Sequence, residues 1–207
     1  SLGPMMLDVR TFSGHTRNAS SIGLGASGQD WAMRLGYAAG KVLLEKMVAV
    51  VGSRKMSDKG EEVTKRVVKK LVDMEMVVVS GLARGVDSVA HAECLRLGGR
   101  TVAVLAHGLD WVYPRENAGL AEKIVDGGGA LVSQLEEGVR PERYFFPLRN
   151  RLIVGMCLGV VVIEAEIKSG TMTTANWAAE LNRKVWVVRG SSGTDLLINE
   201  GVDEWLF

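Results

Sequence analysis

The sequence is poor in cysteine, carries almost no net charge and holds no long apolar run. Its 207 residues include two cysteines, Cys94 and Cys157, and neither belongs to a CxxC motif or has a histidine at metal-ligand spacing. A disulfide framework or a metal site is therefore not expected, and a reducing cytoplasm fits. No apolar run approaches the roughly 20 residues of a membrane helix, and the amino terminus lacks a secretion-signal pattern. We therefore expect a cytoplasmic protein with no membrane partner.

The formal net charge of +1 argues against a uniformly basic nucleic-acid-binding protein. Any affinity for nucleic acid has to come from where the basic residues lie. Hydrophobic residues make up 47% of the chain and charged residues 24%, which is the balance of a globular rather than a disordered protein. The length suits one α/β domain with a substantial core.

Short β-branched runs alternate with longer amphipathic stretches from Met47 onward, and Ser57 and Pro114 mark expected helix starts. Continuous apolar strands separated by helices are typical of a parallel sheet that is covered on both faces. The sequence therefore predicts an α/β fold with a doubly wound, mostly parallel sheet in three layers. The predicted strands are Met47–Val51, Met76–Ser80, Thr101–Leu105, Ala130–Gln134, Val160–Ala165 and Val185–Val188.

The first 45 residues differ from the rest of the chain. They are rich in Gly, Ser and Asn and hold no strand-length apolar run, although residues 31–46 have a helical pattern. The stretch Gly23–Gly28 satisfies GxGxxG, but no strand precedes it, so we interpret it as an ordinary loop rather than a dinucleotide site. We predict an amino-terminal arm and helix over residues 1–45 and the doubly wound core domain over residues 46–207.

The turn after the first strand has the features of a phosphate site. Gly52 and Ser53 follow a buried strand directly and lead toward a helix, so their backbone N–H groups are expected at the carboxyl edge of the sheet, and Arg54 adds a guanidinium. The alternative is a tight turn with a solvated arginine. Ser169, Gly170 and the residues after them form a second candidate, because they begin a helix whose first N–H groups are free. Helix capping by Ser169 or Thr171 is compatible with that role.

Carboxylate and histidine chemistry have weaker support. Asp87 follows Arg84 at a helix start, where capping the helix and orienting Arg84 are favoured over a catalytic role. His91 lies within a helical pattern and is expected in the core, whereas His107 lies beyond the third strand and within reach of a ligand. Neither histidine has a nucleophile partner visible in the sequence.

Basic residues recur in the loops that follow the strands. Since the carboxyl ends of parallel strands meet at one edge of a sheet, these residues are expected to form a basic rim there. Acidic residues share the same loops, so the rim is expected to be patchy. Its basic members are Arg54, Lys55, Arg84, Arg115, Arg140, Arg143, Arg149, Arg151, Lys168 and Arg189.

Three consecutive aromatics, Tyr144, Phe145 and Phe146, stand among the arginines of Arg140–Arg151. If these residues alternate between two faces, the three rings are not buried together, so at least one is expected to meet a ligand while the arginines reach phosphates. Base–aromatic stacking contributes about 1–3 kcal/mol per base, and neutralised phosphates add a salt-dependent component. The pattern favours single-stranded nucleic acid over the alternative, rings packed under the loop with solvated arginines.

Four long blocks follow one another between about Met47 and Val202: VAVVGSRK, VVVSGLARGVDSVAHAECLRLGGRTVAVLAHGLDWVYPREN, FPLRNRLIVGMCLGVVVIEAEIKSGTMTTANWAAELNRKVWVV and LLINEGV. Together they resemble the DprA/Smf family of DNA-processing proteins. The resemblance implies an extended Rossmann-like domain that binds single-stranded DNA, protecting it or handing it to a RecA-type recombinase in DNA uptake or recombination. It leaves homodimer formation open.

The resemblance also implies that the GSR turn, Gly52–Arg54, contacts DNA phosphate. It implies that the FPxRNR segment, Phe146–Arg151, lines the strand-binding pocket, with the SGT turn, Ser169–Thr171, beside it. Two departures, His107 in LAHGLD where the family has LGxGLD and Arg189 in VRG where it has VPG, are expected to alter what this edge accepts. From both lines of reasoning, the expected nucleic-acid-binding residues are Gly52, Ser53, Arg54, Lys55, Arg84, Arg143, Phe146, Arg149, Asn150, Arg151, Lys168, Ser169 and Gly170.

The alternative function is a nucleotide hydrolase. Rossmann-like proteins similar to the LOG phosphoribohydrolases cleave nucleoside monophosphates at the corresponding edge and carry a PGGxGTxxE signature. This chain has EIKSGTMTTANWAAE there without the paired glycines, so Glu164 or Glu180 would have to replace the catalytic glutamate. We therefore favour a non-enzymatic DNA-binding protein that needs no cofactor.

Overall fold

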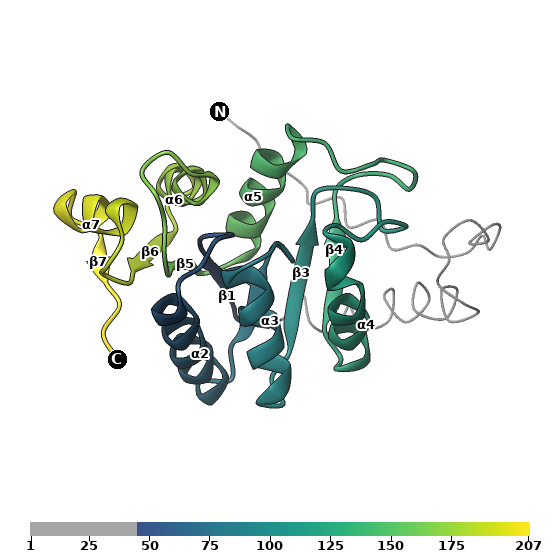
Figure 1. Ribbon diagram of the computed structural model, residues 1–207, viewed down its shortest axis with the longest axis horizontal. Helices are drawn as coiled ribbons and strands as arrows, with labels where there is room; N and C mark the ends of the chain where they lie inside the picture. The colour runs from purple at the N-terminus through teal and green to yellow at the C-terminus, as the bar shows by residue number, and fades with distance from the viewer. Residues whose placement is uncertain (1–44) are drawn as a thin grey trace.

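The computed structural model describes residues 45–207, so the predicted arm and the GxGxxG stretch lie outside the described residues. Within this part of the chain, seven strands form one sheet in the order β4-β3-β2-β1-β5-β6-β7, and every neighbouring pair is parallel (Figure 1). The predicted α/β, doubly wound fold is confirmed. The strands are β1 Met47–Val51, β2 Val77–Ser80, β3 Thr101–Leu105, β4 Ala130–Ser133, β5 Gly159–Val162, β6 Lys184–Val187 and β7 Asp203–Glu204.

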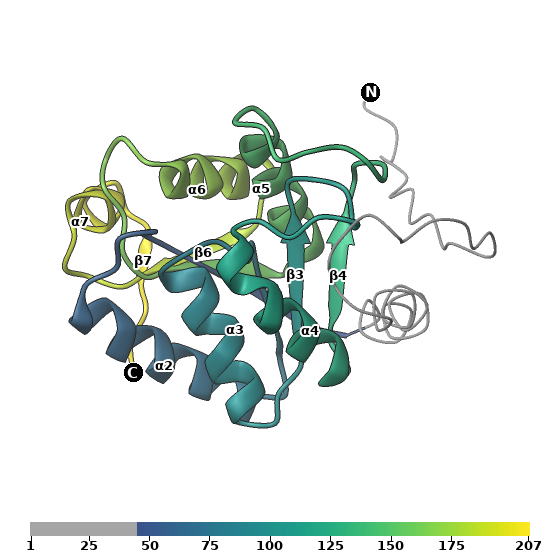
Figure 2. The same cartoon turned by 45° about the vertical axis from the view of Figure 1, so that its right-hand side comes forward.

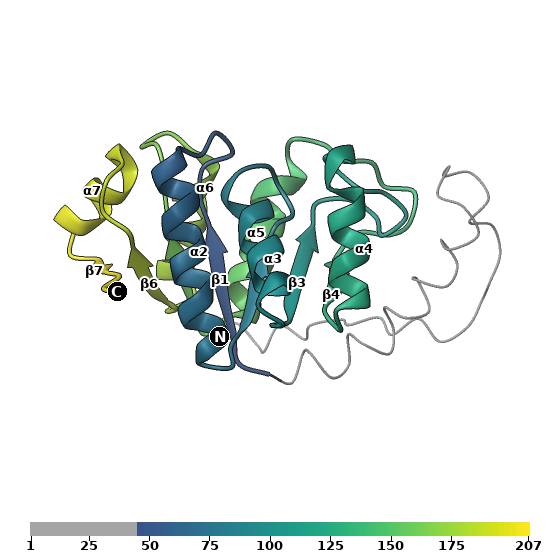
Figure 3. The same ribbon diagram turned by 60° about the horizontal axis from the view of Figure 1, so that its bottom comes forward.

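The helices cover both faces of the sheet. Three of them lie side by side in front of the strands in Figure 3, and α5 and α6 lie behind. The chain therefore crosses from one face to the other after β4, which completes the three predicted layers. The front helices are α2 Asp58–Asp73, α3 Val86–Arg96 and α4 Ala118–Asp126; the others are α5 Phe145–Met156, α6 Gly170–Glu180 and α7 Ser192–Asn199, with a 3-10 turn at Arg115–Asn117.

The central strands β1, β2, β3 and β5 are almost entirely apolar because both of their faces are buried. Ala49 and Val79, which pair across β1 and β2, belong to the core under α5 and α6, while Val48 and Val78, one residue earlier on each strand, belong to the core under α2 and α3. All four side chains are at most 4% exposed. The continuous apolar pattern in the sequence is thus the signature of a sheet between two helix layers.

Several boundaries differ from the sequence prediction. The strand β5 ends at Val162 and not at Ala165, because Glu164 turns aside and accepts hydrogen bonds from the backbone N–H and the hydroxyl of Ser57. Pro114 precedes a 3-10 turn, and α4 begins only at Ala118. The short elements α7 and β7 were not predicted, since neither contains a strong periodic pattern.

The described residues contain no helix that is both long and apolar enough to cross a membrane. Cys94 and Cys157 are buried, free thiols. Burial raises the pKa of the Cys94 thiol to about 12, so it is protonated at neutral pH and is a poor nucleophile.

Candidate nucleic-acid interface

The β1–α2 loop is held in place by the β2–α3 loop beside it. The backbone N–H of Val86 donates to the Ser53 carbonyl at 3.1 Å. Gly85 has a positive φ of 71°, and a Cβ there would lie 2.2 Å from the same carbonyl oxygen; a Cβ on Gly52 would lie 2.6 Å from Val86. Both glycines allow the two loops to touch, and this contact directs Arg54 along the carboxyl edge of the sheet.

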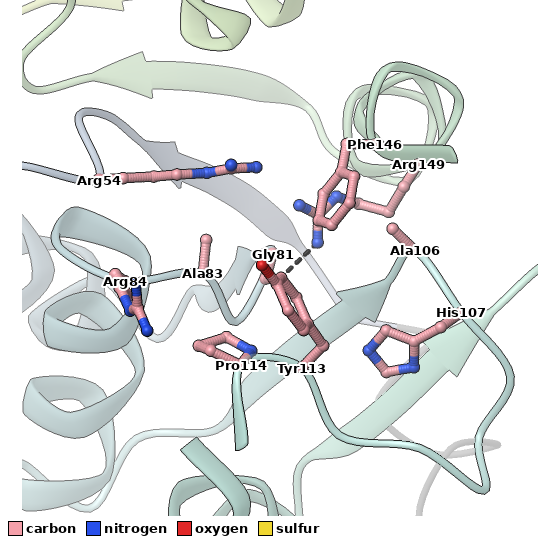
Figure 4. Close-up of a pocket in the computed structure, with 10 residues that line it drawn as sticks. All are labelled: Arg54, Gly81, Ala83, Arg84, Ala106, His107, Tyr113, Pro114, Phe146 and Arg149. Atoms are coloured by element: carbon pink, nitrogen blue, oxygen red, sulfur yellow. Dashed lines mark hydrogen bonds between the residues drawn. The ribbon is translucent and has the colours of Figure 1, made fainter. Parts of the chain in front are cut away.

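A pocket lies at this edge, above β1, β2 and β3 (Figure 4). The loops after these three strands form most of its wall, and α5 closes the remaining side. Among the described residues, three arginines and no carboxylate line it. The lining residues are Arg54, Gly81, Ala83, Arg84, Ala106, His107, Tyr113, Pro114, Phe146 and Arg149.

Phe146 lines the pocket and contacts three of the other lining side chains. The guanidinium carbon of Arg54 lies 5.0 Å from its centroid, and that of Arg149 lies 5.8 Å away. Tyr113 meets the ring edge-on, with the centroids 5.9 Å apart and the planes at 66°. Cation–π attraction holds both guanidinium groups near the ring without neutralising their charge.

Arg149 is a buried part of the pocket floor, since its side chain belongs to a residue only 4% exposed. Its Nη1 donates to the carbonyls of Gly81 and Val104, each at 2.5 Å, and its Nε donates to Asn150 Oδ1 at 3.1 Å. Burial lowers the pKa of Arg149 to about 10, although the charge of nearby Asp87 opposes this effect. The guanidinium therefore remains charged at neutral pH.

Asp87 organises the loop beneath the pocket. Its carboxylate accepts the backbone N–H groups of Gly81 at 3.1 Å and Ala83 at 3.3 Å. Burial raises the pKa of this carboxyl group, while Arg149 opposes the rise. The prediction that Asp87 caps the helix and orients Arg84 is wrong on both points. Gly85 is the N-cap of α3, which has no side-chain cap, and the Arg84 guanidinium forms an ion pair with Glu116 at the surface.

The two histidines of this region lie where the sequence placed them. His91 is completely buried on α3, and its Nδ1 is 2.6 Å from the hydroxyl of Thr101. His107 lines the pocket wall and is only 1% exposed, with Nδ1 2.9 Å from the Gly108 carbonyl oxygen. Burial lowers the pKa of His107, which favours the neutral ring.

Only part of the predicted basic rim converges on the pocket. Arg54, Arg84 and Arg149 do, whereas Arg151 lies over the ring of Trp177, 5.1 Å from its centroid. Arg149 and Arg151 belong to α5 and not to a loop, contrary to the prediction, because the helix begins at Phe145. The exposed residues Lys55, Arg143 and Lys168 and the outlying Arg115, Arg140 and Arg189 are not among the lining residues.

The SGT turn lies beside α5, although it does not line the pocket. Asn150 connects the two, since its Nδ2 donates to the Gly170 carbonyl at 3.3 Å. Ser169 precedes α6 as predicted, but its hydroxyl is buried and finds no hydrogen-bond partner among the described residues. The expected side-chain cap is therefore not formed.

Sequence reasoning did not identify Gly81, Ala83, Ala106, Tyr113 or Pro114 as pocket residues. The Tyr-Pro pair directly follows the LAHGLDW segment, and an aromatic residue before a proline in a loop after a strand was the available signal. For Gly81 the signal was a glycine directly after a buried strand, where close backbone approach is expected. In the structure a Cβ there would lie 2.4 Å from Arg149 Nη1, so a larger residue would displace the buried guanidinium.

A second, smaller depression lies between the start of α2 and the ends of β5 and β6. Ser57, Lys59, Glu164 and Arg189 line it, and Glu164 is already engaged by Ser57. Glu180 is the last residue of α6, at the end of the helix away from the SGT turn. Neither candidate glutamate lines the pocket around Phe146.

Comparison with known proteins shows which family the chain belongs to. A sequence model described as DNA recombination-mediator protein A matches residues 33–205. The chain belongs to this family. It is 44% identical over 144 residues to protein Smf of Synechocystis, an alignment that covers 70% of this chain and 36% of the relative. It is also 43% identical over 161 residues to DprA of Streptococcus pneumoniae, covering 74% of this chain and 56% of that protein.

Solved structures of the DprA family share the fold. The X-ray structure of S. pneumoniae DprA superposes with a TM-score of 0.75 at 39% identity, covering 80% of this chain and 60% of that one. DprA from Helicobacter pylori, whose single-stranded DNA binding mode has been studied structurally, gives 0.74 at 28% identity, covering 79% and 77%. The chain spans 36–56% of the length of the first three curated relatives it matches.

Proposed function

We propose that this chain is a DprA-type protein that binds single-stranded DNA, with the pocket around Phe146 holding a stretch of its backbone. The observation that carries this proposal is the lining of the pocket: three arginines, the rings of Tyr113 and Phe146, and no carboxylate among the described residues. Duplex DNA hides its bases from such a pocket, whereas a single strand offers both phosphates and unstacked bases to it. The family membership and the H. pylori relative support the same ligand.

The residues of the pocket have different roles in this proposal. Arg54 is exposed and supplies a charged fork to a phosphate, while the ring of Phe146 keeps its guanidinium aligned. Arg149 adds positive potential from the floor and, through the Gly81 carbonyl, fixes the wall opposite. Gly52 and Ser53 act mainly by positioning Arg54, and the outlying Lys55, Arg143, Arg151 and Lys168, with the SGT turn, extend the electrostatic path of the strand.

We further propose that the protein works in DNA uptake or recombination by protecting the strand or handing it to a RecA-type recombinase, as a binding protein and not as an enzyme. The description of the family as a recombination mediator supports this role. Homodimer formation belongs to the same proposal, because two pockets on one assembly hold a long strand with far greater avidity than one.

Salt-dependent binding of a labelled single strand tests the DNA assignment. Arg54→Ala should weaken binding and lower the slope of log K against log salt by roughly 0.7, as expected for the loss of one phosphate contact on a single strand. Arg189→Ala is the matched control, since that guanidinium pairs with Glu204 outside the pocket. Unchanged affinity and slope for Arg54→Ala would show that the loop does not contact DNA.

The nucleotide hydrolase remains the competing function, and its test is direct. Incubation with AMP followed by chromatography should release no free adenine if the protein only binds. Release of adenine that is abolished in Glu164→Gln or Glu180→Gln would replace the binding proposal with an enzymatic one.

A further inference from the structure

Tyr144 and Phe146 stand two residues apart but occupy different surroundings. Phe146 is half-buried and already contacts two guanidinium groups and Tyr113. Tyr144 is 58% exposed, so most of its ring surface is open to solvent. An exposed tyrosine ring combines a flat apolar face with a polar hydroxyl, the combination that is enriched at binding interfaces.

Phe145 supports the exposed ring from behind. The centroids of Tyr144 and Phe145 are 4.1 Å apart with the planes tilted by 41°, and Phe145 is itself half-buried at the first position of α5. A ring that is packed on one side loses little further freedom when a flat ligand covers the other side. The pair is therefore a pre-formed platform and not a freely rotating side chain.

The platform stands at the start of α5, the helix that carries Phe146 to the pocket. Two Cα–Cα steps, at most about 7.6 Å, separate Tyr144 from Phe146, which lines the pocket. The loop that ends at Tyr144 runs along the carboxyl edge beyond β3 and β4 (Figure 2). Arg143 is an exposed cation next to the platform, and the only acidic neighbour within two residues of Tyr144 in sequence is Glu142.

We propose that Tyr144, backed by Phe145, is a second base-stacking subsite, which receives a nucleobase of the strand that leaves the pocket. The inference rests on the proposed single-stranded DNA function and assigns the two rings different roles in it. Phe146 keeps Arg54 aligned for a phosphate, and Tyr144 provides the open π face for a base. Every base has such a face, so this subsite is tolerant of sequence. It also sets a minimum length for tight binding, because a strand confined to the pocket does not reach it.

Length-dependent binding measured by fluorescence anisotropy tests this subsite. For a thymidine oligonucleotide of about 16 nucleotides, Tyr144→Ala should weaken binding roughly 5- to 150-fold, the range expected for one stacked base. Tyr144→Leu should behave like alanine, since it restores apolar bulk without a π face, whereas Tyr144→Trp should bind at least as well as the native chain. For a thymidine dinucleotide, all four proteins should bind equally.

The salt slope and a distant ring provide the controls. Tyr144→Ala removes no charge, so its salt slope should equal that of the native chain, unlike Arg54→Ala. Phe207→Ala removes a ring of similar exposure, 51%, that lies under Arg66 away from the pocket, and it should leave DNA binding unchanged.

Two results would overturn the subsite. Native affinity in Tyr144→Ala, with binding still lost in Arg54→Ala, would leave the DNA function standing and remove the platform from it. Native DNA affinity together with a changed oligomeric state in light scattering would assign the ring to a protein interface. If the native chain fails to bind any single strand, the failure belongs to the proposed function itself.

Discussion

The two halves of the sheet's carboxyl edge treat arginine differently. Above β1–β3, Arg54 and Arg149 lie beside a ring, and Arg149 donates to backbone carbonyls. Above β6 and β7, Arg189 donates to the carboxylate of Glu204 at 3.0 Å. A ring or a carbonyl leaves the positive charge available, whereas a carboxylate cancels it. Arg84 is the exception in the pocket half, because Glu116 pairs with it at the rim.

This contrast teaches that counting basic residues along an edge is a poor guide to anion binding. What matters is which partners the cations already have. The pocket half also buries several titratable groups beneath its surface, Asp87, His91 and Arg149, and these couple the stability of the fold to the geometry of the site. The far half has exposed ion pairs instead, which contribute little to the stability of the fold or to the geometry of the site.

The largest effect is expected from Arg149→Met. The change removes two hydrogen bonds to buried carbonyls and leaves Asp87 without its nearby positive charge, and breaking such a buried arrangement typically costs about 3–5 kcal/mol of unfolding free energy. Urea denaturation measures the loss. Arg189→Met is the matched control in the far half and should change stability little. Equal losses in the two variants would abolish the distinction between the halves.

The sequence was sufficient for the fold because both sheet faces are buried. Six of the seven strands were found from continuous apolar runs, and helix starts such as Ser57 were found from capping chemistry, with the Ser57 hydroxyl accepting the Gly60 N–H at 3.0 Å. The strand β7 was missed because Asp203 and Glu204 carry no apolar signal. Local patterns report burial, so elements with little burial stay hidden.

The site was predicted less completely, for a different physical reason. Which cations share a pocket depends on their partners across the fold, and sequence spacing does not reveal that Arg151 lies over Trp177 or that Arg84 pairs with Glu116. The helix formed by the FPLRNR segment was also unexpected. Pro147 lies in its first turn, where proline is tolerated, but in the sequence a proline favours the prediction of a loop. Tertiary contacts decided these positions.

Acid should destabilise the pocket half through His91. Burial lowers the pKa of this imidazole from 6.5 to about 3, so the folded state stays neutral while the unfolded state takes up a proton as the pH falls below 6.5. The stability that neutral His91 contributes is complete above pH 6.5 and is lost by about 1.4 kcal/mol per pH unit below it. Urea midpoints measured between pH 7 and about 4.5 report this slope.

His91→Gln provides the comparison, because glutamine can still bond Thr101 but does not titrate in this range. The variant's stability should fall less steeply with acid than that of the native chain. Parallel slopes for the two proteins would mean that His91 is not the group responsible.

Gly81→Ala should perturb the pocket from its wall. A Cβ at Gly81 would lie 2.4 Å from the buried Arg149 Nη1, so the guanidinium has to move, at an expected loss of about 1–3 kcal/mol in unfolding free energy. Gly170→Ala is the matched control in the far half, since a Cβ there meets nothing within 4 Å among the described residues. Thermal unfolding of the two variants compares them, and similar shifts in both would contradict the tight contact.

The smallest effect on stability is expected for the Arg189–Glu204 ion pair, which represents the far half in the comparison. Both side chains are substantially exposed, 55% and 34%, so solvent screens their attraction. A double-mutant cycle with Arg189→Ala and Glu204→Ala should give a coupling free energy of about 0.2–1 kcal/mol. This is much less than the about 3–5 kcal/mol of unfolding free energy expected for Arg149→Met. Glu204→Ala has a second use, because it frees the Arg189 guanidinium without adding a basic residue. If partners rather than counts decide anion binding, this variant should gain single-strand affinity at low salt, and the gain should vanish when Arg189→Ala is added.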